Sequence, residues 1–170
     1  MKYGIAIFPS KKLQDFVNSY RKRYDPHYSM IPPHITLLSP FEATEEQIKG
    51  ITQKVWEIAS KTPPVELNLL KTSTFQPVNN VIYLKVEMTK ALETLRKQLD
   101  NSIDSKDEYP FVPHLTIAQG LSNDEHSDLF GQLSMTDIRY SETIDRFHLL
   151  YQLENGSWTV YETFQLGKEL

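Results

Sequence analysis

The sequence predicts an α+β fold made of two pseudo-symmetric lobes. Strand-like and helix-like segments alternate along the 170 residues, and no low-complexity stretch or long Pro/Gly linker divides them. The same order of segments occurs twice, and 80 positions separate the matching histidines His34 and His114. This period is longer than that of a solenoid repeat. We therefore expect one domain, residues 1–170, with approximate halves 1–78 and 79–170.

The first half is expected to form a strand, a helix, a second strand and a second helix. Residues 2–8 mix β-branched and aromatic side chains, which is typical of a strand. Ser10 is a suitable N-cap for a helix whose apolar positions recur at helical spacing: Leu13, Phe16, Val17 and Tyr20. A strand at 34–39 follows. Thr44 and Gln47 then form a capping box ahead of one apolar helix face: Ile48, Ile51, Val55 and Ile58.

The second half repeats this order after strands at 65–75 and 81–87. Thr89 can cap a helix with one apolar face: Leu92, Leu95, Leu99 and Ile103. A strand at 114–120 precedes a second capping box, Ser122 with Glu125, and a helix carrying Leu129, Phe130 and Leu133. Strands are expected at 136–141, 144–153 and 157–165. Asn155-Gly156 between the last two predicts a hairpin, because both residue types tolerate positive φ.

Composition and charge exclude several classes of function. The chain contains no cysteine, which excludes disulfides, thiolate zinc sites, iron–sulfur clusters and cysteine nucleophiles. Its net charge of −4 argues against an extended nucleic-acid track, which requires clustered Lys and Arg. No apolar run approaches the roughly 18 residues of a membrane span, and the N-terminal apolar segment is too short for a secretory signal. We expect a cytoplasmic protein without membrane contact.

The repeated motif Pro-His-apolar-Thr-apolar is the strongest functional signal. It stands at residues 33–37 and again at 113–117. Because strand side chains alternate between faces, His34 shares a face with Thr36, and His114 with Thr116. The intervening apolar residues can anchor each strand in the core. If the halves meet about a pseudo-two-fold axis, both histidine–threonine pairs converge on one cleft.

Two histidines and two hydroxyls suit phosphoester chemistry. With an ordinary pKa near ~6.5, one imidazole can accept a proton from the nucleophile while the other donates one to the leaving oxygen. The hydroxyls of Thr36 and Thr116 can bind the phosphate oxygens. This chemistry needs no metal or other cofactor. The alternatives are a non-catalytic binding protein for phosphorylated nucleotides or RNA termini, a metal-dependent hydrolase that combines the histidines with carboxylates, and a pair of purely structural histidines.

The remaining histidines give no metal-binding signature. His27 lies in a loop close to the first motif and could border the cleft. His126 falls in the first turn of a capped helix, where we expect it to be solvated. His148 shares a strand face with Arg146, which favours a pair on the sheet surface over a basic cleft wall.

Several charged and aromatic residues near the motifs have two interpretations. The basic run 21–23 could contact RNA, but a basic run at a helix end is expected to stay solvated and to complement the helix dipole. Three aromatic side chains could stack on a nucleobase or pack in the protein: Phe41, Tyr109 and Phe111. Three acidic residues stand where a helix N-terminus favours negative charge: Glu42, Glu45 and Glu46.

The two motifs, His34-Ile35-Thr36-Leu37 and His114-Leu115-Thr116-Ile117, resemble those of the two-histidine (2H) phosphoesterase superfamily. The N-terminal segment 3–9, the segment 145–151 and Asn155-Gly-Ser-Trp are similar to the YjcG-type phosphoesterases of bacteria. The resemblance implies a bilobal fold with antiparallel sheets lining a central cleft and helices outside. It also implies metal-independent hydrolysis of a small or terminal phosphodiester, such as the 2′,3′-cyclic phosphate of a nucleotide or RNA end. Family usage makes His34 the proton donor and His114 the proton acceptor.

Overall fold

The computed structural model describes residues 1–103 and 110–168. Strands and helices alternate through the first part of the chain and strands dominate the last part. In chain order the elements are β1 (Lys2–Ile7), α1 (Lys11–Tyr24), β2 (Ile35–Glu42), α2 (Glu45–Lys61), β3 (Val65–Thr74), β4 (Ile82–Val86), α3 (Lys90–Asn101), β5 (His114–Ala118), α4 (Asn123–Ser134), β6 (Tyr140–Ile144), β7 (Arg146–Gln152) and β8 (Trp158–Gln165).

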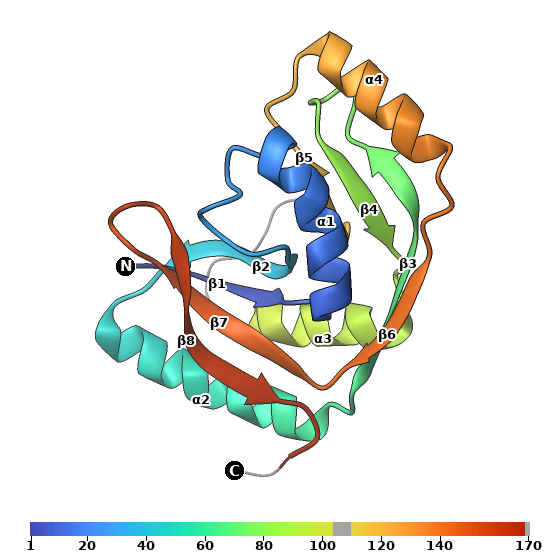
Figure 1. Cartoon of the computed structure of the whole chain (residues 1–170). Coiled ribbons are helices and arrows are strands. Elements are labelled where there is room, and N and C mark those ends of the chain that lie inside the picture. Colours follow the sequence, from blue (N-terminus) through green and yellow to red (C-terminus); the bar gives the residue numbers. More distant parts are fainter. Residues whose placement is uncertain (104–109, 169–170) are drawn as a thin grey trace.

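The eight strands of the described residues form one antiparallel sheet in the order β6-β3-β4-β5-β2-β1-β7-β8. The order is symmetric about the boundary between β5 and β2, the two strands that carry the motifs. Beside each motif strand lies the first strand of the same repeat, which is β1 beside β2 and β4 beside β5. The sheet curls into a half-barrel, and its two sides diverge from this boundary (Figure 1). The predicted α+β class with antiparallel strands is confirmed.

Each side of the sheet contains strands from both halves of the sequence. β3 precedes residue 79 but lies between β4 and β6, whereas β7 and β8 extend the side that begins with β2 and β1. Only Asp145 separates β6 from β7, although these strands pair with β3 and β1 on opposite sides of the sheet. The C-terminal segment therefore links the two sides directly.

Two pairs of helices cover the sheet. α2 and α3 contact each other and pack on β8 and β2, while α1 packs on β5 and α4 on β3 (Figure 1). Each helix begins at its predicted cap: Ser10, Thr44, Thr89 and Ser122 each accept a hydrogen bond from a backbone N–H in the first turn. The predicted apolar helix faces supply fully buried core side chains, among them Leu13, Val55, Leu99 and Leu133.

The expected strand at 136–141 is shifted in the structure. α4 ends at Ser134, and the chain turns there because the Thr136 N–H donates to the Leu133 carbonyl oxygen. Pairing with β3 starts only at Tyr140, which lies opposite Leu69. The other predicted strands and helices are confirmed within a few residues. Across residues 1–103 and 110–168, no helix combines the length and apolarity needed to cross a membrane.

Candidate active site

The two sequence motifs lie on the two central strands of the sheet. Ile35 of β2 pairs with Leu115 of β5, and both side chains are fully buried. In this antiparallel register His34 lies across from Thr116, and Thr36 across from His114. All four polar side chains therefore share the opposite face of the sheet at the boundary between its two sides. Solvent exposure repeats in the same order over residues 31–38 and 111–118.

The two imidazoles are held in the same way. Nδ1 of His34 lies 2.9 Å from the carbonyl oxygen of Pro32, and Nδ1 of His114 lies 2.8 Å from that of Val112. A carbonyl oxygen can only accept, so each Nδ1 carries the hydrogen. In the neutral imidazole Nε2 is then the unprotonated nitrogen, and neither Nε2 bonds to any described residue. Each ring is fixed in one tautomer and keeps one nitrogen available for proton transfer.

The surroundings of the two histidines differ. A cavity of about 320 Å³ is lined by His34, Thr36 and Thr116. His114 is not part of its lining; its ring packs edge-on against Phe75 and Tyr83, with centroids 5.1 and 5.2 Å away. The two motifs are therefore equivalent in their own conformation, but the side chains that surround the two histidines in space are different.

Burial lowers the pKa of both histidines below the ordinary value. For His34 desolvation is the largest cause, and the Arg21 guanidinium and His114 also lower the pKa. The hydrogen bond to Pro32 and the Asp25 carboxylate act in the opposite direction. For His114 desolvation outweighs the effect of the hydrogen bond to Val112. Both imidazoles are therefore more readily neutral than a solvated histidine.

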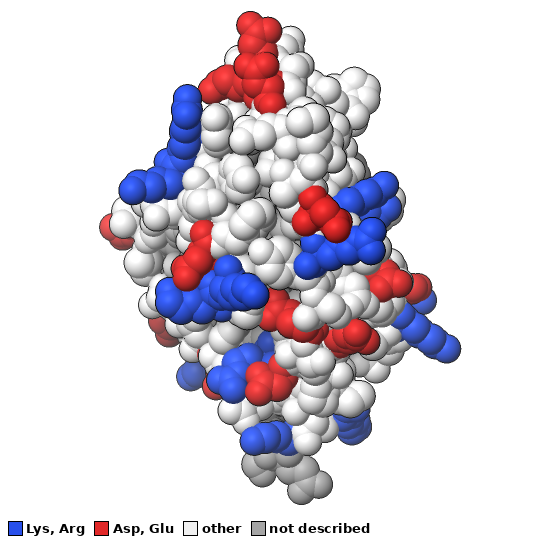
Figure 2. Space-filling model, turned by 45° about the vertical axis from the view of Figure 1, so that its right-hand side comes forward, with Lys and Arg blue, Asp and Glu red and all other residues white. Residues whose placement is uncertain are grey.

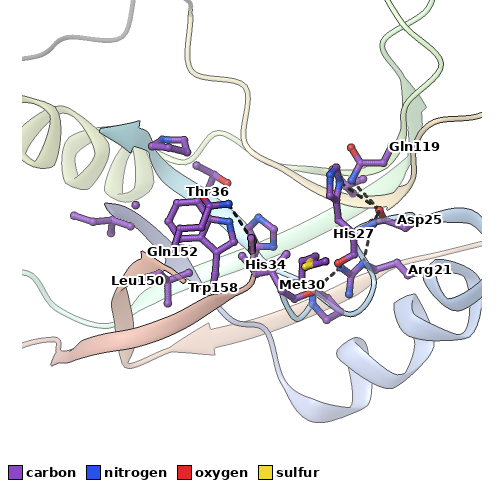
Figure 3. A pocket seen from close by; sticks show the side chains of 18 of the residues that line it. Arg21, Asp25, His27, Met30, His34, Thr36, Gln119, Leu150, Gln152 and Trp158 are labelled. Atoms are coloured by element: carbon purple, nitrogen blue, oxygen red, sulfur yellow. Dashed lines mark hydrogen bonds and ion pairs between the residues drawn. The ribbon is translucent and has the colours of Figure 1, made fainter. Parts of the chain in front are cut away.

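A buried ionic network borders the His34 side of the cavity (Figure 3). Arg21 Nε donates to Asp25 Oδ2 at 3.1 Å, and these two side chains are only 3% and 2% exposed. Arg21 also donates to the carbonyl oxygen of Ile31 at 2.7 Å, and Gln119 donates to Asp25 Oδ1 at 2.9 Å. The network fixes the loop that leads to His34 and links it to the end of β5.

The prediction that the basic run 21–23 stays solvated is wrong for Arg21, which is part of this network. Arg21 is buried because its position faces β5 and the loop 25–31, where Asp25 and the loop carbonyls satisfy its donors. Lys22 and Arg23 are exposed, as expected. The helix C-terminus therefore holds one structural arginine and two surface cations.

The other three histidines have different positions. His27 lines the cavity and its ring lies 3.8 Å from Asp25 Oδ1, which agrees with a place at the border of the cleft. The expectation of a solvated His126 is wrong: the residue is 3% exposed, bonds Thr74 Oγ1 through Nε2 at 2.8 Å and stacks on Phe130. Its face of α4 is turned toward β3 and not toward solvent. His148 bonds Thr163 on the sheet surface and does not line the cavity.

Two of the three candidate stacking aromatics pack within the protein. Phe41 is buried and stacks on Tyr3, with ring centroids 6.2 Å apart. Phe111 packs against the core and carries the guanidinium of Arg96 over its ring at 5.3 Å. Tyr109 lies outside the described residues. Packing is therefore the role of the two aromatics that the structure describes.

Several cavity residues were not anticipated from the sequence. Three of them come from segments remote from the motifs and are brought to the cavity by the pairing of β1 with β7 and of β7 with β8: Gly4, Gln152 and Trp158. The other three are close in sequence to one of the motifs, but no local pattern marks them as part of a site: Asp25, Met30 and Gln119. Within the described ranges no three His, Asp or Glu side chains gather in an arrangement able to hold a metal ion.

Comparisons with known proteins agree with this architecture. The family model described as the 2′-5′ RNA ligase superfamily matches residues 9–156. A Bacillus licheniformis protein that bears the provisional name phosphoesterase is 58% identical over 168 residues, covering 98% of this chain and 99% of its own. Two solved structures share the fold at low identity. For Escherichia coli LigT in apo form the TM-score is 0.73 and the sequence identity is 18%, and the match covers 98% of each chain. For TT0787 of Thermus thermophilus the TM-score is 0.72 and the sequence identity is 19%, and the match covers 100% of each chain.

The family model covers most of the chain, and the Bacillus relative matches it almost end to end. The curled antiparallel sheet with a histidine–threonine pair on each central strand is the arrangement implied by the sequence resemblance. The chain belongs to the 2′-5′ RNA ligase superfamily of 2H phosphoesterases.

Proposed function

We propose that this protein is a metal-independent phosphoesterase that hydrolyses a small or terminal phosphodiester, with a 2′,3′-cyclic phosphate of a nucleotide or RNA end as the preferred substrate. The observation that carries the proposal is the matched pair of imidazoles. Each is fixed through Nδ1 to a backbone carbonyl and keeps Nε2 available beside a threonine of the facing strand. A phosphoryl group between them would meet two proton-transfer groups and two hydroxyls.

In the proposed reaction His114 accepts a proton from water, and the water oxygen attacks phosphorus. The bond between phosphorus and one ribose oxygen breaks, and protonated His34 gives its proton to that leaving oxygen. The product is a phosphomonoester, and the two histidines exchange their protonation states before the next turnover. Thr36 and Thr116 donate hydrogen bonds to the non-bridging oxygens and orient phosphorus for in-line attack. The assignment of donor and acceptor follows family usage.

Three further observations support this proposal. LigT, which shares the fold, has been solved with phosphate and with 3′-AMP. The cavity is large enough for a nucleotide-sized ligand and is bounded by the loop after α1 and by the β7–β8 hairpin. On the molecular face of Figure 2, Lys and Arg are interspersed with Asp and Glu, and no continuous basic surface crosses it. These features favour a compact phosphorylated ligand over a long nucleic acid.

The decisive experiment is a turnover screen with EDTA present. Its substrates are 2′,3′-cyclic nucleotides, oligoribonucleotides with cyclic ends, ADP-ribose cyclic phosphate and a nonspecific phosphodiester. We expect turnover of the cyclic phosphates. Binding without turnover would favour the non-catalytic binding protein instead. Activity that disappears with EDTA and returns with a divalent cation would contradict the metal-independent reaction.

The first prediction concerns the two histidines themselves. His34→Gln and His114→Gln should each lower kcat by about 10²–10⁴-fold, because each removes one proton-transfer group. The double variant should be hardly worse than the less active single variant, since the two act as a unit. His148→Gln, on the same sheet but outside the cavity, is the matched control and should keep full activity. Full activity of either motif variant would overturn the mechanism.

A further inference from the structure

The imidazole of His114 packs against aromatic rings of β4 and of the turn that follows β3. Its centroid lies 5.1 Å from that of Phe75 and 5.2 Å from that of Tyr83, and the two aromatic rings are 4.3 Å apart. Phe75 directly follows the last residue of β3 and begins the turn 75–81, which does not line the cavity. The surroundings of His114 therefore depend on how this turn is held.

A hydroxyl on the other face of the sheet holds the turn. Thr74 precedes Phe75 and points away from His114, because strand side chains alternate between faces. Its Oγ1 lies 2.8 Å from Nε2 of His126 on α4 and accepts a hydrogen bond from the Gln76 N–H at 3.1 Å. We propose that His126, acting through the Thr74 hydroxyl, positions the aromatic ring that packs on the imidazole of His114. The inference rests on the proposed function and adds two positioning residues to it.

His126 is suited to this role because it is enclosed. The residue is 3% exposed and its ring stacks on Phe130, with centroids 5.6 Å apart and an angle of 19° between the planes. A buried imidazole requires hydrogen-bond partners, and the hydroxyl of Thr74 can serve either tautomer because it can donate or accept. The enclosed ring leaves little room for water to replace this bond.

A second group of hydrogen bonds fixes the same turn. The Gln76 side chain donates to Asn80 Oδ1 at 2.9 Å. Asn80 Nδ2 in turn lies 3.0 Å from both the carbonyl oxygen of Leu121 and Oδ1 of Asn123, and donates to them. These bonds and the bond to His126 all join the turn to the segment that leads from β5 into α4 (Figure 1). The turn therefore has a fixed position relative to the strand that carries His114.

The expected effect of loosening the turn is a change in the solvation of His114. Desolvation is the largest cause of its lowered pKa, and the rings of Phe75 and Tyr83 contribute to that desolvation. The ionisable side chains that face His114 are Tyr83 and Lys85 on β4 and His34 beside β2. None of them belongs to the turn. A looser turn should thus raise the pKa of His114 toward 6.5 without changing the charges around it.

The same strand contains a matched control for Thr74. Thr72 lies two residues earlier on the same face of β3, and its buried hydroxyl has no hydrogen-bond partner among the described residues. Thr72→Val therefore removes the same group as Thr74→Val without breaking a bond to the turn or to α4. Thr74→Ser is the conservative variant that retains the hydroxyl.

The test combines steady-state kinetics on a cyclic nucleotide with an NMR titration of the His114 Cε1–H, assigned by its absence from His114→Gln. Thr74→Val and His126→Phe should each lower kcat by about 10–10²-fold, because the imidazole is no longer held in position. Neither should change KM, because the cavity lining is untouched. Both should raise the pKa of His114. Thr74→Ser and Thr72→Val should keep the kcat and the His114 pKa of the parent protein.

Phe75→Leu tests the same contacts from the other end. It removes the ring but keeps the hydrogen bonds of the turn, so it remains informative even where Thr74→Val fails to fold. We expect the same fall in kcat and the same rise in the His114 pKa. The double variant of Thr74→Val with Phe75→Leu should be hardly less active than Phe75→Leu alone, because both changes act through one ring. Additive losses would show that Thr74 does not act through Phe75.

The outcomes separate this inference from the proposed function. Urea unfolding of each variant identifies a temperature at which all of them are folded for the kinetics. If Thr74→Val lowers stability but keeps the kcat and the His114 pKa of the parent, the bond to His126 is only structural, and the phosphoesterase stands without it. If the parent protein turns over no phosphodiester, the proposed function is wrong, and an unchanged His114 titration in Thr74→Val overturns the positioning as well.

Discussion

The imidazoles of His34 and His114 are both desolvated, and this determines the expected pH dependence. Burial lowers the pKa of each below its usual value of 6.5. The proton acceptor must be neutral, which requires a pH above its pKa, and the donor must be protonated, which requires a pH below its pKa. When both pKa values are lowered, the fraction of protein in the active state is largest below pH 6.5.

The second prediction is therefore a bell-shaped profile of kcat/KM with its maximum below pH 6.5 and a steady fall towards pH 8. Its two limbs report the coupled titration of the pair and not separate pKa values of the two residues. The measurement is kcat/KM for a cyclic nucleotide between pH 4.5 and 9. A maximum above pH 7.5, or a flat profile, would contradict this reasoning.

The third prediction concerns Arg21 and Asp25, which are buried and paired. Arg21→Met leaves the Asp25 carboxylate buried without its cation, which should cost about 3–5 kcal/mol of unfolding free energy. Lys11 and Asp15 supply a matched control, because they have the same i,i+4 spacing on the same helix but are 88% and 65% exposed. Lys11→Met should cost no more than about 0.5 kcal/mol. Equal losses in urea unfolding would show that burial does not set the strength of these pairs.

At the scale of the elements, capping decides where the helices begin. Thr44 accepts from the Gln47 N–H, and the Gln47 side chain accepts from the Thr44 N–H; Ser122 and Glu125 repeat the arrangement on α4. These reciprocal bonds satisfy N–H groups that have no partner within the helix. The two capping boxes are local in sequence, which is why the pattern alone predicted them.

The fourth prediction follows from these caps. Thr44→Ala and Ser122→Ala should each cost about 1 kcal/mol of unfolding free energy, because each leaves a first-turn N–H without its side-chain acceptor. The losses should add in the double variant, since the caps are on different helices. Thr44→Ser and Ser122→Thr keep the hydroxyl and should be close to neutral. Alanine variants as stable as these controls in urea unfolding would show that the caps contribute nothing.

Which face of a helix is covered was less predictable. α4 has a weaker apolar pattern than the other helices, and a histidine in its first turn gave no sign of burial. The packing of α4 on β3 provides Thr74 as a partner, so His126 is enclosed and hydrogen-bonded. Arg21 is a second example. The periodicity of α1 predicted which apolar residues of this helix are buried, but it did not predict that Arg21 is buried on the same face.

At the scale of the whole molecule, the pairing of β2 with β5 is the contact that assembles the candidate site. Ile35 and Leu115 form the register pair between these strands in the described part of the chain. Their burial brings His34, Thr36, His114 and Thr116 onto one face. The site is thus assembled by the contact between the two sides of the sheet, and its geometry depends on core packing beneath it.

The fifth prediction compares two fully buried leucines. Leu115→Ala and Leu133→Ala should each cost about 2–5 kcal/mol, through lost burial and a new cavity. Only Leu115→Ala should also lower kcat at a temperature where both variants remain folded, because it loosens the junction that positions the two pairs. Leu133 belongs to α4, which packs on β3, and it does not line the cavity. Equal activity per folded molecule would indicate that the junction tolerates the cavity without moving the pairs.

The sequence by itself determined the alternation of strands and helices, the four caps, the duplicated order and the two histidine–threonine motifs. All of these depend on short-range patterns, namely strand alternation, helical periodicity and reciprocal capping within a few residues. Only the tertiary structure decided that strands of both sequence halves share each side of the sheet, that Arg21 and His126 are buried, and that Gly4, Gln152 and Trp158 lie beside His34. Gly4 reaches Gln152 and Trp158 through the pairing of β1 with β7, at the other end of the chain. His126 is enclosed by Thr74, 52 residues away, and Arg21 by the loop carbonyls that precede β2. In each case the partner of a side chain is set by sheet order, register and packing, and no short sequence pattern records it.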